Sequence, residues 1–296
     1  MTLLDRLRSG EILIGDGAWG TMLMARGLAA GQPPERWTLE RPDALAEIAL
    51  LYVAAGANLI TTNTFGASPL RLRMHGLDAD VDRLNARAVA IAREAVGGHA
   101  YVSASVGPTG HLLAPLGDAQ PDEVYRGYVR QIAALAEAGA DAICIETMTD
   151  VEEAALAVRA ARATAPQLPV LVSMSFEVTR RGAFTVMGVS PAMAVARLGD
   201  AGADVIGANC GTGPEAMRHV ADEFAGASGR PAIFQPNAGL PEQIRGDLVY
   251  PQGPDAYAQE AAKLAGAGGR IVGGCCGTTP EHIRALARAI RERSTS

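Results

Sequence analysis

The sequence is poor in lysine, in cysteine and in net positive charge, and each shortage excludes a class of protein. Lys263 is the only lysine among 26 lysine and arginine residues, so a mechanism that needs a Schiff-base lysine has a single candidate. Acidic residues outnumber basic ones by 32 to 26, for a net charge of -6, which gives nucleic acid or an anionic membrane no evident binding surface. Four cysteines in 296 residues are too few for a disulfide-based scaffold.

Long apolar segments are also missing. The longest uncharged run, residues 48–70, is interrupted by glycine, asparagine and threonine, and we interpret it as a helix end followed by a strand, not as a membrane span. The beginning of the chain contains Asp5, Arg6 and Arg8 and has no apolar segment typical of a signal peptide. These features predict a globular, cytoplasmic protein, in which a reducing environment keeps the cysteines as thiols.

A short pattern, Ala-Gly-Ala or a close variant, recurs at the ends of predicted helices and is followed at once by a β-rich run. Glycine just after a helix is the usual C-terminal signal, so each copy indicates the change from a helix to a strand. The copies lie at residues 54–57, 138–140, 201–203 and 265–269.

Eight short apolar runs alternate with stretches of helical periodicity. The predicted strands span residues 12–18, 58–63, 101–107, 142–148, 170–176, 205–210, 232–237 and 271–276. Helical periodicity is clear at residues 43–55, 81–96, 122–138, 151–163 and 281–293. This alternation predicts an α/β fold, a (β/α)8 TIM barrel, with a doubly wound parallel sheet as the alternative. No linker-like segment divides the chain, so we expect a single domain over residues 1–296.

Polar and sulfur-bearing residues gather at the carboxyl ends of the predicted strands, which is the end where a barrel carries its active site. They are Asp16, Asn63, Glu146, Cys210, Asn237 and the pair Cys275-Cys276. This placement predicts one shared site.

Three of the four cysteines have a spacing that suits a metal site. Cys210 lies 65 residues before Cys275, which at roughly 35 residues per unit is two strands around the ring, so the sulfurs of Cys210, Cys275 and Cys276 are expected to converge above the seventh strand. Glycines beside the vicinal pair let the backbone turn so that both thiols face one point. Three thiolates favour zinc and leave its fourth position open for a substrate thiol. The alternative is that they are small core residues, which is our interpretation of Cys144 in mid-strand.

Asn237 completes this predicted centre. It ends the seventh strand, between the two strands that carry the thiols, and we expect it to contact the substrate. Its amide oxygen is the candidate fourth zinc ligand until a substrate thiol displaces it.

A set of short motifs extends over nearly the whole chain. The motifs are Asp-Gly-Ala-Trp-Gly-Thr-Met at residues 16–22, Asn-Thr-Phe at 63–65, Gly-Pro-Thr-Gly at 107–110, Glu-Thr at 146–147, Gly-Ala-Asn-Cys at 207–210, Pro-Asn-Ala-Gly at 236–239 and Gly-Gly-Cys-Cys-Gly-Thr-Thr-Pro at 273–280. In type and order they resemble the motifs of the homocysteine S-methyltransferases. The set is most similar to the homocysteine-binding module of cobalamin-dependent methionine synthase.

The resemblance implies a zinc-dependent methyltransferase that activates homocysteine as a zinc-bound thiolate and methylates it to methionine. It also implies that zinc, held by Cys210, Cys275 and Cys276, is the catalytic centre. These are the positions that the spacing of the cysteines had already indicated.

The resemblance further implies which residues bind the amino-acid part of the substrate. Asp16 and Glu146 match the residues that hold the ammonium group, and Gly17, Ala18 and Trp19 match the turn whose backbone N–H groups bind the carboxylate. Opposed carboxylates suit a cation, and a glycine-rich turn before a helix suits an anion. From the residues alone, Asp16 is explained equally well as a helix N-cap and Glu146 as the partner of a buried arginine.

The resemblance to the methionine synthase module implies a methylcorrinoid as the methyl donor. No Asp-x-His-x-x-Gly segment of the corrinoid-binding type occurs, and the five histidines are expected in loops or on helix surfaces. We therefore expect the methylcorrinoid to be supplied by a separate protein. Members of the family that use betaine are longer and carry tyrosines near the positions of Gly66 and Thr147. Members that use S-methylmethionine or S-adenosylmethionine have a similar length and are the alternative.

Two other functions fit parts of the pattern. Gly273-Gly274 followed by Thr278-Thr279-Pro280 is similar to a phosphate-binding loop, but a phosphate site leaves the cysteines unexplained. A non-catalytic alternative is a zinc-stabilised barrel that serves as a thiol carrier or as a subunit of a larger complex. Turnover with homocysteine separates this alternative from an enzyme, because both bind metal.

Overall fold

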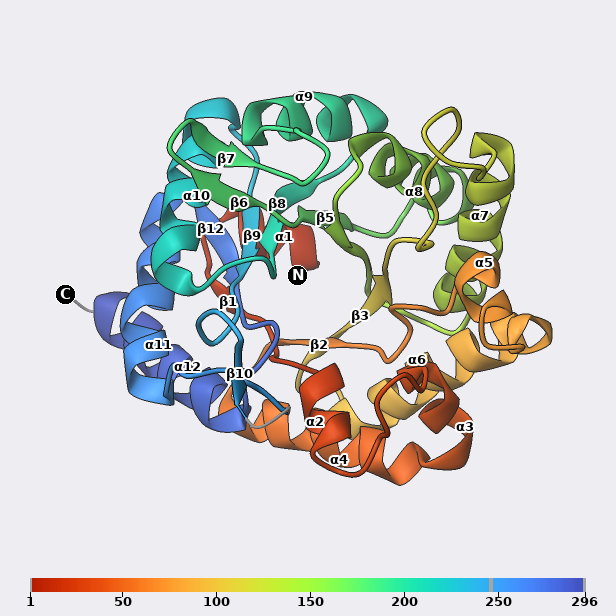
Figure 1. Ribbon diagram of the computed structural model, residues 1–296. Coiled ribbons are helices and arrows are strands. Elements are labelled where there is room, and N and C mark those ends of the chain that lie inside the picture. Colours follow the sequence, from red (N-terminus) through yellow and green to blue (C-terminus); the bar gives the residue numbers. More distant parts are fainter. Residues whose placement is uncertain (1, 245–246, 295–296) are drawn as a thin grey trace.

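The computed structural model describes residues 2–244 and 247–294, within which eight parallel strands form a barrel surrounded by helices (Figure 1). The barrel strands are β1 (Leu13–Ile14), β2 (Leu59–Thr61), β3 (Tyr101–Val106), β4 (Ala142–Met148), β5 (Val170–Met174), β8 (Val205–Asn209), β9 (Ala232–Gln235) and β12 (Gly269–Val272). Their order is β1-β12-β9-β8-β5-β4-β3-β2, and a parallel bridge between Gly15 and Leu59 closes the ring. Every predicted run overlaps one of these strands, and the predicted (β/α)8 barrel is confirmed.

Helices cover the outside of the barrel (Figure 1). The α-helices are α1 (Leu3–Arg8), α2 (Gly20–Met24), α3 (Trp37–Glu40), α4 (Pro42–Ala55), α5 (Pro69–Arg73), α6 (Val81–Val96), α7 (Pro121–Glu137), α8 (Val151–Thr164), α9 (Pro191–Ala201), α10 (Pro214–Ala227), α11 (Pro254–Ala261) and α12 (Pro280–Ser294). Short 3-10 helices are η1 (Pro34–Arg36), η2 (Asp78–Asp80) and η3 (Ala262–Ala267). Within the described ranges, none of the helices combines the length and the apolar character that crossing a membrane requires.

The ends of these helices follow from local sequence. Pro42 occupies the first position of α4, where an N–H group has no intrahelical partner to lose. Gly56 ends α4 in the left-handed conformation at φ 102°, and Gly202 ends α9 at φ 110°. A side chain at such a φ is strained, so glycine stops each helix and directs the chain into the next strand. The predicted role of the Ala-Gly-Ala copies is confirmed at these positions.

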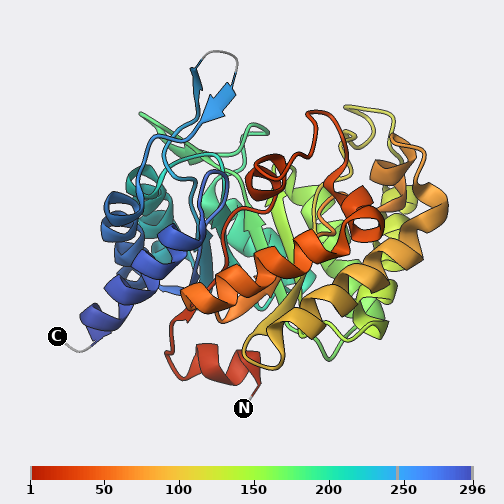
Figure 2. The ribbon, with the colours of Figure 1, turned by 90° about the horizontal axis from the view of Figure 1, so that it is seen from below.

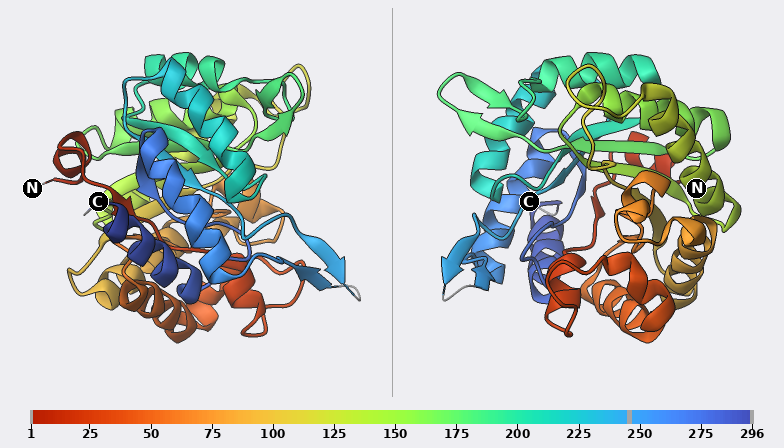
Figure 3. Two further views of the ribbon diagram at one scale, coloured as in Figure 1. Left: turned by 90° about the vertical axis from the view of Figure 1, so that its left-hand side faces the viewer. Right: turned by 45° about the vertical axis from the view of Figure 1, so that its right-hand side comes forward.

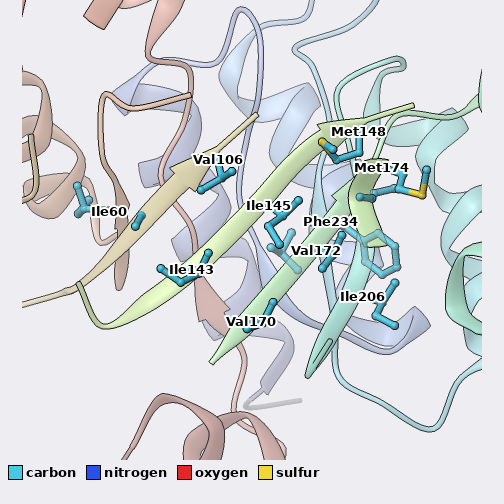
Figure 4. Close-up of a cluster of buried hydrophobic side chains, with 14 of the residues drawn as sticks. Ile60, Val106, Ile143, Ile145, Met148, Val170, Val172, Met174, Ile206 and Phe234 are labelled. Atoms are coloured by element: carbon cyan, nitrogen blue, oxygen red, sulfur yellow. The ribbon is translucent and has the colours of Figure 1, made fainter. Parts of the chain in front are cut away.

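Two apolar clusters build the core. The larger lies between the strands and the surrounding helices, and Figure 4 shows its side chains on β2 to β5, β8 and β9. The smaller fills one end of the barrel interior, where strand residues such as Leu13 and Ile271 meet Leu3 and Leu7 of α1. Burial of each leucine stabilises the fold by about 1.5–3 kcal/mol. Because α1 closes this end of the barrel, only the opposite end is open for a site.

Two antiparallel hairpins interrupt the repeat, and the sequence patterns did not predict them. One consists of β6 (Glu177–Thr179) and β7 (Gly182–Phe184), and the other of β10 (Glu242–Ile244) and β11 (Asp247–Val249). They follow β5 and β9, so both leave the carboxyl end of the barrel. Figures 2 and 3 show the second hairpin projecting from the end opposite to α1.

Candidate metal centre and substrate site

The three predicted metal ligands come together at the carboxyl end of the barrel. Cys210 follows β8 while Cys275 and Cys276 follow β12, and β9 lies between these two strands. The Sγ atom of Cys276 is 3.9 Å from that of Cys210 and 4.0 Å from that of Cys275, and all three lie within 4.8 Å of one another. In a tetrahedral zinc site with Zn–S bonds of about 2.3 Å, sulfurs are about 3.8 Å apart. The sulfur triangle therefore has the size of a zinc site.

Backbone turns direct the cysteines toward one another. Cys210 has a positive φ of 59°, which is rare for a residue with a side chain and turns the chain sharply at the end of β8. Beyond the vicinal pair, Gly277 has a φ of 78° and lies against the ring of Tyr250. A Cβ at Gly277 would lie 2.2 Å from Cγ of Tyr250, so only glycine fits. The predicted freedom of the glycines beside the pair is confirmed at this position.

The three thiols share their protons. Hydrogen bonds from Cys275 and Cys276 hold the pKa of Cys210 below its usual range. Hydrogen bonding to Cys210 raises the pKa of Cys275 and that of Cys276. The cluster thus loses one proton readily and resists losing the next, because negative charge accumulates among three close sulfurs. A divalent cation compensates that charge, so the triangle is suited to a metal ion.

Two further side chains border the sulfur triangle. Asn237, which follows β9, is buried, and a hydrogen bond from its side chain helps to lower the pKa of Cys210. Its Oδ1 atom has no hydrogen-bond partner in the part of the chain that the structure describes. Tyr250 follows β11 and its side chain hydrogen-bonds to Cys276, while burial raises the pKa of the Tyr250 hydroxyl. Sequence reasoning missed Tyr250, since it follows the hairpin, outside the strand-helix repeat.

Asp16 is buried at the end of β1, where its carboxylate accepts three hydrogen bonds. Thr61 donates its backbone N–H to Oδ2 at 2.7 Å and its hydroxyl to Oδ1 at 2.9 Å. The indole Nε1 of Trp19 donates to Oδ2 at 2.9 Å. Burial nevertheless raises the pKa of Asp16 to about 6. The N-cap alternative is wrong, because the N-cap residue of α2 is Trp19.

Glu146 is partly buried on β4, and its partner is a serine instead of an arginine. The hydroxyl of Ser105, on β3, donates to the Glu146 carboxylate. Burial is the main cause that raises the pKa of Glu146 to about 7, and the negative charges of Asp16 and Cys210 contribute to this rise. The protonation of Glu146 therefore depends on the charge of Asp16 and on that of the sulfur triangle. A cationic group that binds between the two carboxylates relieves this repulsion.

The turn that contains Gly17, Ala18 and Trp19 is held by the loop after β12. The N–H of Ala18 donates to Oγ1 of Thr278 at 3.1 Å, and the hydroxyl of Tyr52 donates to the carbonyl of Ala18 at 2.7 Å. In the structure the Ala18 N–H therefore donates to Thr278, whereas the family resemblance implies that it donates to the substrate carboxylate. The Thr278 hydroxyl also donates to the Cys275 carbonyl at 2.6 Å. This loop serves to fix the turn, so the phosphate alternative gains no support here.

Other candidate residues have structural roles. Cys144 is 4% exposed and lies in the closed end of the barrel interior, as expected of a core residue. Asn63 donates its amide to the carbonyl of Pro34 at 2.8 Å. His282, expected on a surface, is buried, and its ring accepts from the N–H of Thr279. The expectation of a surface position for His282 is therefore wrong, because its face of α12 packs against the loop after β11, where its Nε2 contacts the Gln252 carbonyl.

The chain is similar in sequence to known proteins. The model of the family described as Homocysteine S-methyltransferase matches residues 13–290. The methionine synthase of Mycobacterium leprae is 34% identical over 307 residues, which cover 97% of this chain and 25% of that protein. The methionine synthase of Mycobacterium tuberculosis matches with the same identity and coverage. The chain thus spans about a quarter of the length of the curated relatives it matches.

Solved structures agree with the sequence comparison. The metallated form of the homocysteine methyltransferase MmuM from Escherichia coli has a TM-score of 0.77 at 27% identity, over 94% of this chain and 96% of that one. Its apo form has a TM-score of 0.75 at 26% identity, over 97% and 98%. The carboxyl transferase domain of Rhizobium etli pyruvate carboxylase shares the fold alone, with a TM-score of 0.55 at 15% identity. With a family match that extends from β1 into α12, the chain belongs to the homocysteine S-methyltransferase family.

Proposed function

We propose that this chain transfers a methyl group to homocysteine to form methionine, and that zinc on Cys210, Cys275 and Cys276 activates the substrate thiol. The observation that carries the proposal is the placement of three thiols and two carboxyl groups of raised pKa at one end of one barrel. Homocysteine presents a thiol, an ammonium group and a carboxylate, and each finds a partner there. We also propose that residues 1–296 form one homocysteine-binding domain.

The ligand set supports zinc as the metal. Three thiolates suit a borderline-soft ion, and the partial exposure of the cysteines leaves a path for a substrate sulfur. When bound, zinc supplies a Lewis acid that lowers the pKa of the substrate thiol, so that homocysteine binds as its thiolate. Oδ1 of Asn237 is buried and has no hydrogen-bond partner among the described residues. It therefore suits the fourth coordination position of the zinc ion in the substrate-free protein.

The remaining groups orient the amino acid. The carboxylates of Asp16 and Glu146 hold the ammonium group, and that interaction favours the charged form of both acids. Backbone N–H groups of Gly17 and Trp19 bind the substrate carboxylate. The Ala18 N–H donates to Thr278, so it can bind the substrate carboxylate only if it gives up this hydrogen bond.

The proposed transfer is a direct displacement. The bond between the methyl carbon and its donor breaks as the bond to the homocysteine sulfur forms, and the donor leaves with the bonding electrons. No residue needs to act as a general base, because the thiol proton leaves when the substrate binds. His282 does not serve as one, since its ring is engaged with Thr279 and with the Gln252 carbonyl.

The donor that we propose is a methylcorrinoid carried by a separate protein or domain. Its support is the 34% identity to two methionine synthases, of which this chain spans about a quarter. A second candidate is S-methylmethionine or S-adenosylmethionine. The similarity to the E. coli homocysteine methyltransferase supports homocysteine as the methyl acceptor with either donor.

A panel of donors tests the proposal. The zinc-loaded protein is incubated with homocysteine and, separately, methylcobalamin, S-methylmethionine, S-adenosylmethionine or betaine, and methionine is quantified by mass spectrometry. Methionine formed with one donor, and absent with the Cys210→Ala variant, supports the proposal and identifies the donor. A protein that binds zinc and homocysteine but yields no methionine with any donor, with or without an added corrinoid protein, is the non-catalytic barrel instead.

A further inference from the structure

We propose that Asn209 is a positioning residue that joins the sulfur triangle to the substrate-binding carboxylate of Glu146, an inference that rests on the proposed function of both groups. Asn209 is the last residue of β8 and directly precedes Cys210. Its side chain is 1% exposed and contacts neighbouring strands at the site end of the barrel. It therefore connects residues that the sequence places far apart.

The first connection is to Thr147, the residue after Glu146. Oδ1 of Asn209 accepts the backbone N–H of Thr147 at 2.8 Å, and Nδ2 of Asn209 donates to the Thr147 hydroxyl at 2.7 Å. Ser173, on β5 between the two strands, donates its hydroxyl to the same Oδ1 at 2.8 Å. The carboxamide thus fixes one residue of β4 by two hydrogen bonds of opposite direction.

The conformation of Thr147 explains why it needs to be fixed. Its φ is 59°, in the left-handed region that β-branched residues avoid. The pairing of β4 with β5 shifts register between Ile145 and Met148, as at a β-bulge. Bulges redirect side chains near active sites. The Asn209 amide holds this irregular turn and thereby sets the direction in which Glu146 leaves the strand.

The second connection is to the metal centre. The Nδ2 atom of Asn209 lies 3.8 Å from Sγ of Cys275 and donates to it. Donation of an N–H to a sulfur favours the thiolate form and orients the ligand. Counting both lone pairs and both N–H groups, the carboxamide uses its four hydrogen-bonding positions, on Thr147 twice, on Ser173 and on Cys275.

The Asn209 side chain links the position of the metal centre to the position of the ammonium-binding carboxylate, and the proposed reaction requires both. The same amide group holds a sulfur of the triangle and the turn that carries the ammonium-binding acid. A small rotation of Asn209 moves both, so the substrate sulfur and the substrate ammonium group are kept in a fixed relation. A residue with this role matters for zinc affinity as well as for homocysteine affinity.

Asn209→Asp tests the sulfur contact, with Ser173→Ala as the matched control. The variant keeps the size of the side chain but replaces the N–H beside Cys275 with an anionic oxygen. We expect a loss of zinc affinity of about 10- to 100-fold, the usual effect of removing a partner of a metal ligand. Ser173→Ala removes one hydrogen bond from the same carboxamide, and the three that remain, to Thr147 and Cys275, keep it in place, so its zinc affinity stays close to that of wild type. Competition with a chromophoric chelator measures both.

Thr147→Ala and Thr147→Ser test the other contact and decide the question if Asn209→Asp does not fold. The alanine variant loses the hydroxyl that Nδ2 bonds to, whereas the serine variant keeps it. We expect homocysteine affinity, measured by calorimetry on the zinc-loaded protein, to fall about tenfold in Thr147→Ala, the effect of one hydrogen bond, and to be nearly unchanged in Thr147→Ser.

The outcomes separate this inference from the proposed function. Wild-type zinc affinity in Asn209→Asp, or an equal loss in Ser173→Ala, overturns the role of the sulfur contact while zinc binding by the wild type stands. Equal homocysteine affinities in the two Thr147 variants overturn the role of the turn. A wild-type protein that binds no zinc overturns the proposed function and this inference together.

Discussion

The Sγ atoms of Cys210 and Cys276 lie 3.9 Å apart, although 66 residues separate the two positions. Only the adjacency of β8, β9 and β12 in the ring brings them together. We expect the wild type to bind one zinc ion, and Cys210→Ala, Cys275→Ala and Cys276→Ala each to lose it. Cys144→Ala is the control, because Cys144 lies in the closed end of the barrel and should leave the metal content unchanged. Metal analysis that shows the reverse pattern would mean that the ligands are assigned wrongly.

Substitution of the two acids should weaken substrate binding without affecting the metal. Asp16→Asn and Glu146→Gln each remove a charge that the substrate ammonium group contacts in our proposal. We expect a loss of roughly 1.5 to 3 kcal/mol in homocysteine binding, the scale of a charged hydrogen bond. Calorimetry on zinc-loaded proteins measures this, and wild-type affinity in both variants would argue against the ammonium site.

The raised pKa of Glu146 predicts a pH dependence of stability in the metal-free protein. Burial raises this pKa to about 7, above the value of about 4.3 expected in the unfolded chain. The folded state therefore binds a proton more tightly, and the resulting stability is complete below the unfolded pKa and is lost as the pH rises through 7. The shift corresponds to at most about 4 kcal/mol, since one pKa unit is about 1.4 kcal/mol.

Glu146→Gln measures this contribution, because glutamine stays neutral. Relative to wild type, the variant should gain stability between about pH 5 and about pH 8, as followed by urea unfolding in the presence of a chelator. The exposed Glu94, on α6, provides the control variant Glu94→Gln, which should follow the wild type. Parallel stability curves for wild type and Glu146→Gln would show that burial does not shift this pKa.

The fourth metal ligand should change when substrate binds. In our proposal Oδ1 of Asn237 occupies the fourth position until the homocysteine sulfur replaces it. X-ray absorption at the zinc edge should then report three sulfurs and one light atom without homocysteine, and four sulfurs with it. Asn237→Ala should keep the three sulfurs and exchange the light atom for water. Four sulfurs in the substrate-free protein would contradict the role of Asn237 as the fourth ligand.

Proton release should accompany homocysteine binding and not methyl transfer. About one proton should appear in weak buffer when homocysteine alone is added to the zinc-loaded protein, because the metal lowers the pKa of the thiol. Stopped-flow absorbance with an indicator dye separates this event from the addition of donor. Release only after the donor, or a methylated cysteine detected by mass spectrometry after donor alone, would indicate a two-step route through the protein.

The sequence by itself determined the barrel fold and most of the candidate site residues at the carboxyl ends of its strands. Proline at helix starts, glycine at helix ends and eight apolar runs are local signals, so they predict strands and helices without knowledge of their packing. Once the strands are parallel in a closed ring, their carboxyl ends share one rim, which is why Asp16, Glu146 and the cysteines could be assigned to one site.

Only the tertiary structure decided how these residues interact. The contact between Asn209 and Thr147 joins residues 62 positions apart. The contact of Tyr250 with Cys276 depends on the hairpin before Tyr250, which lies outside the repeat of strands and helices. The engagement of the Ala18 N–H by Thr278 spans 260 positions. Hydrogen-bond partners and desolvation depend on which atoms meet after folding, and no local pattern specifies them.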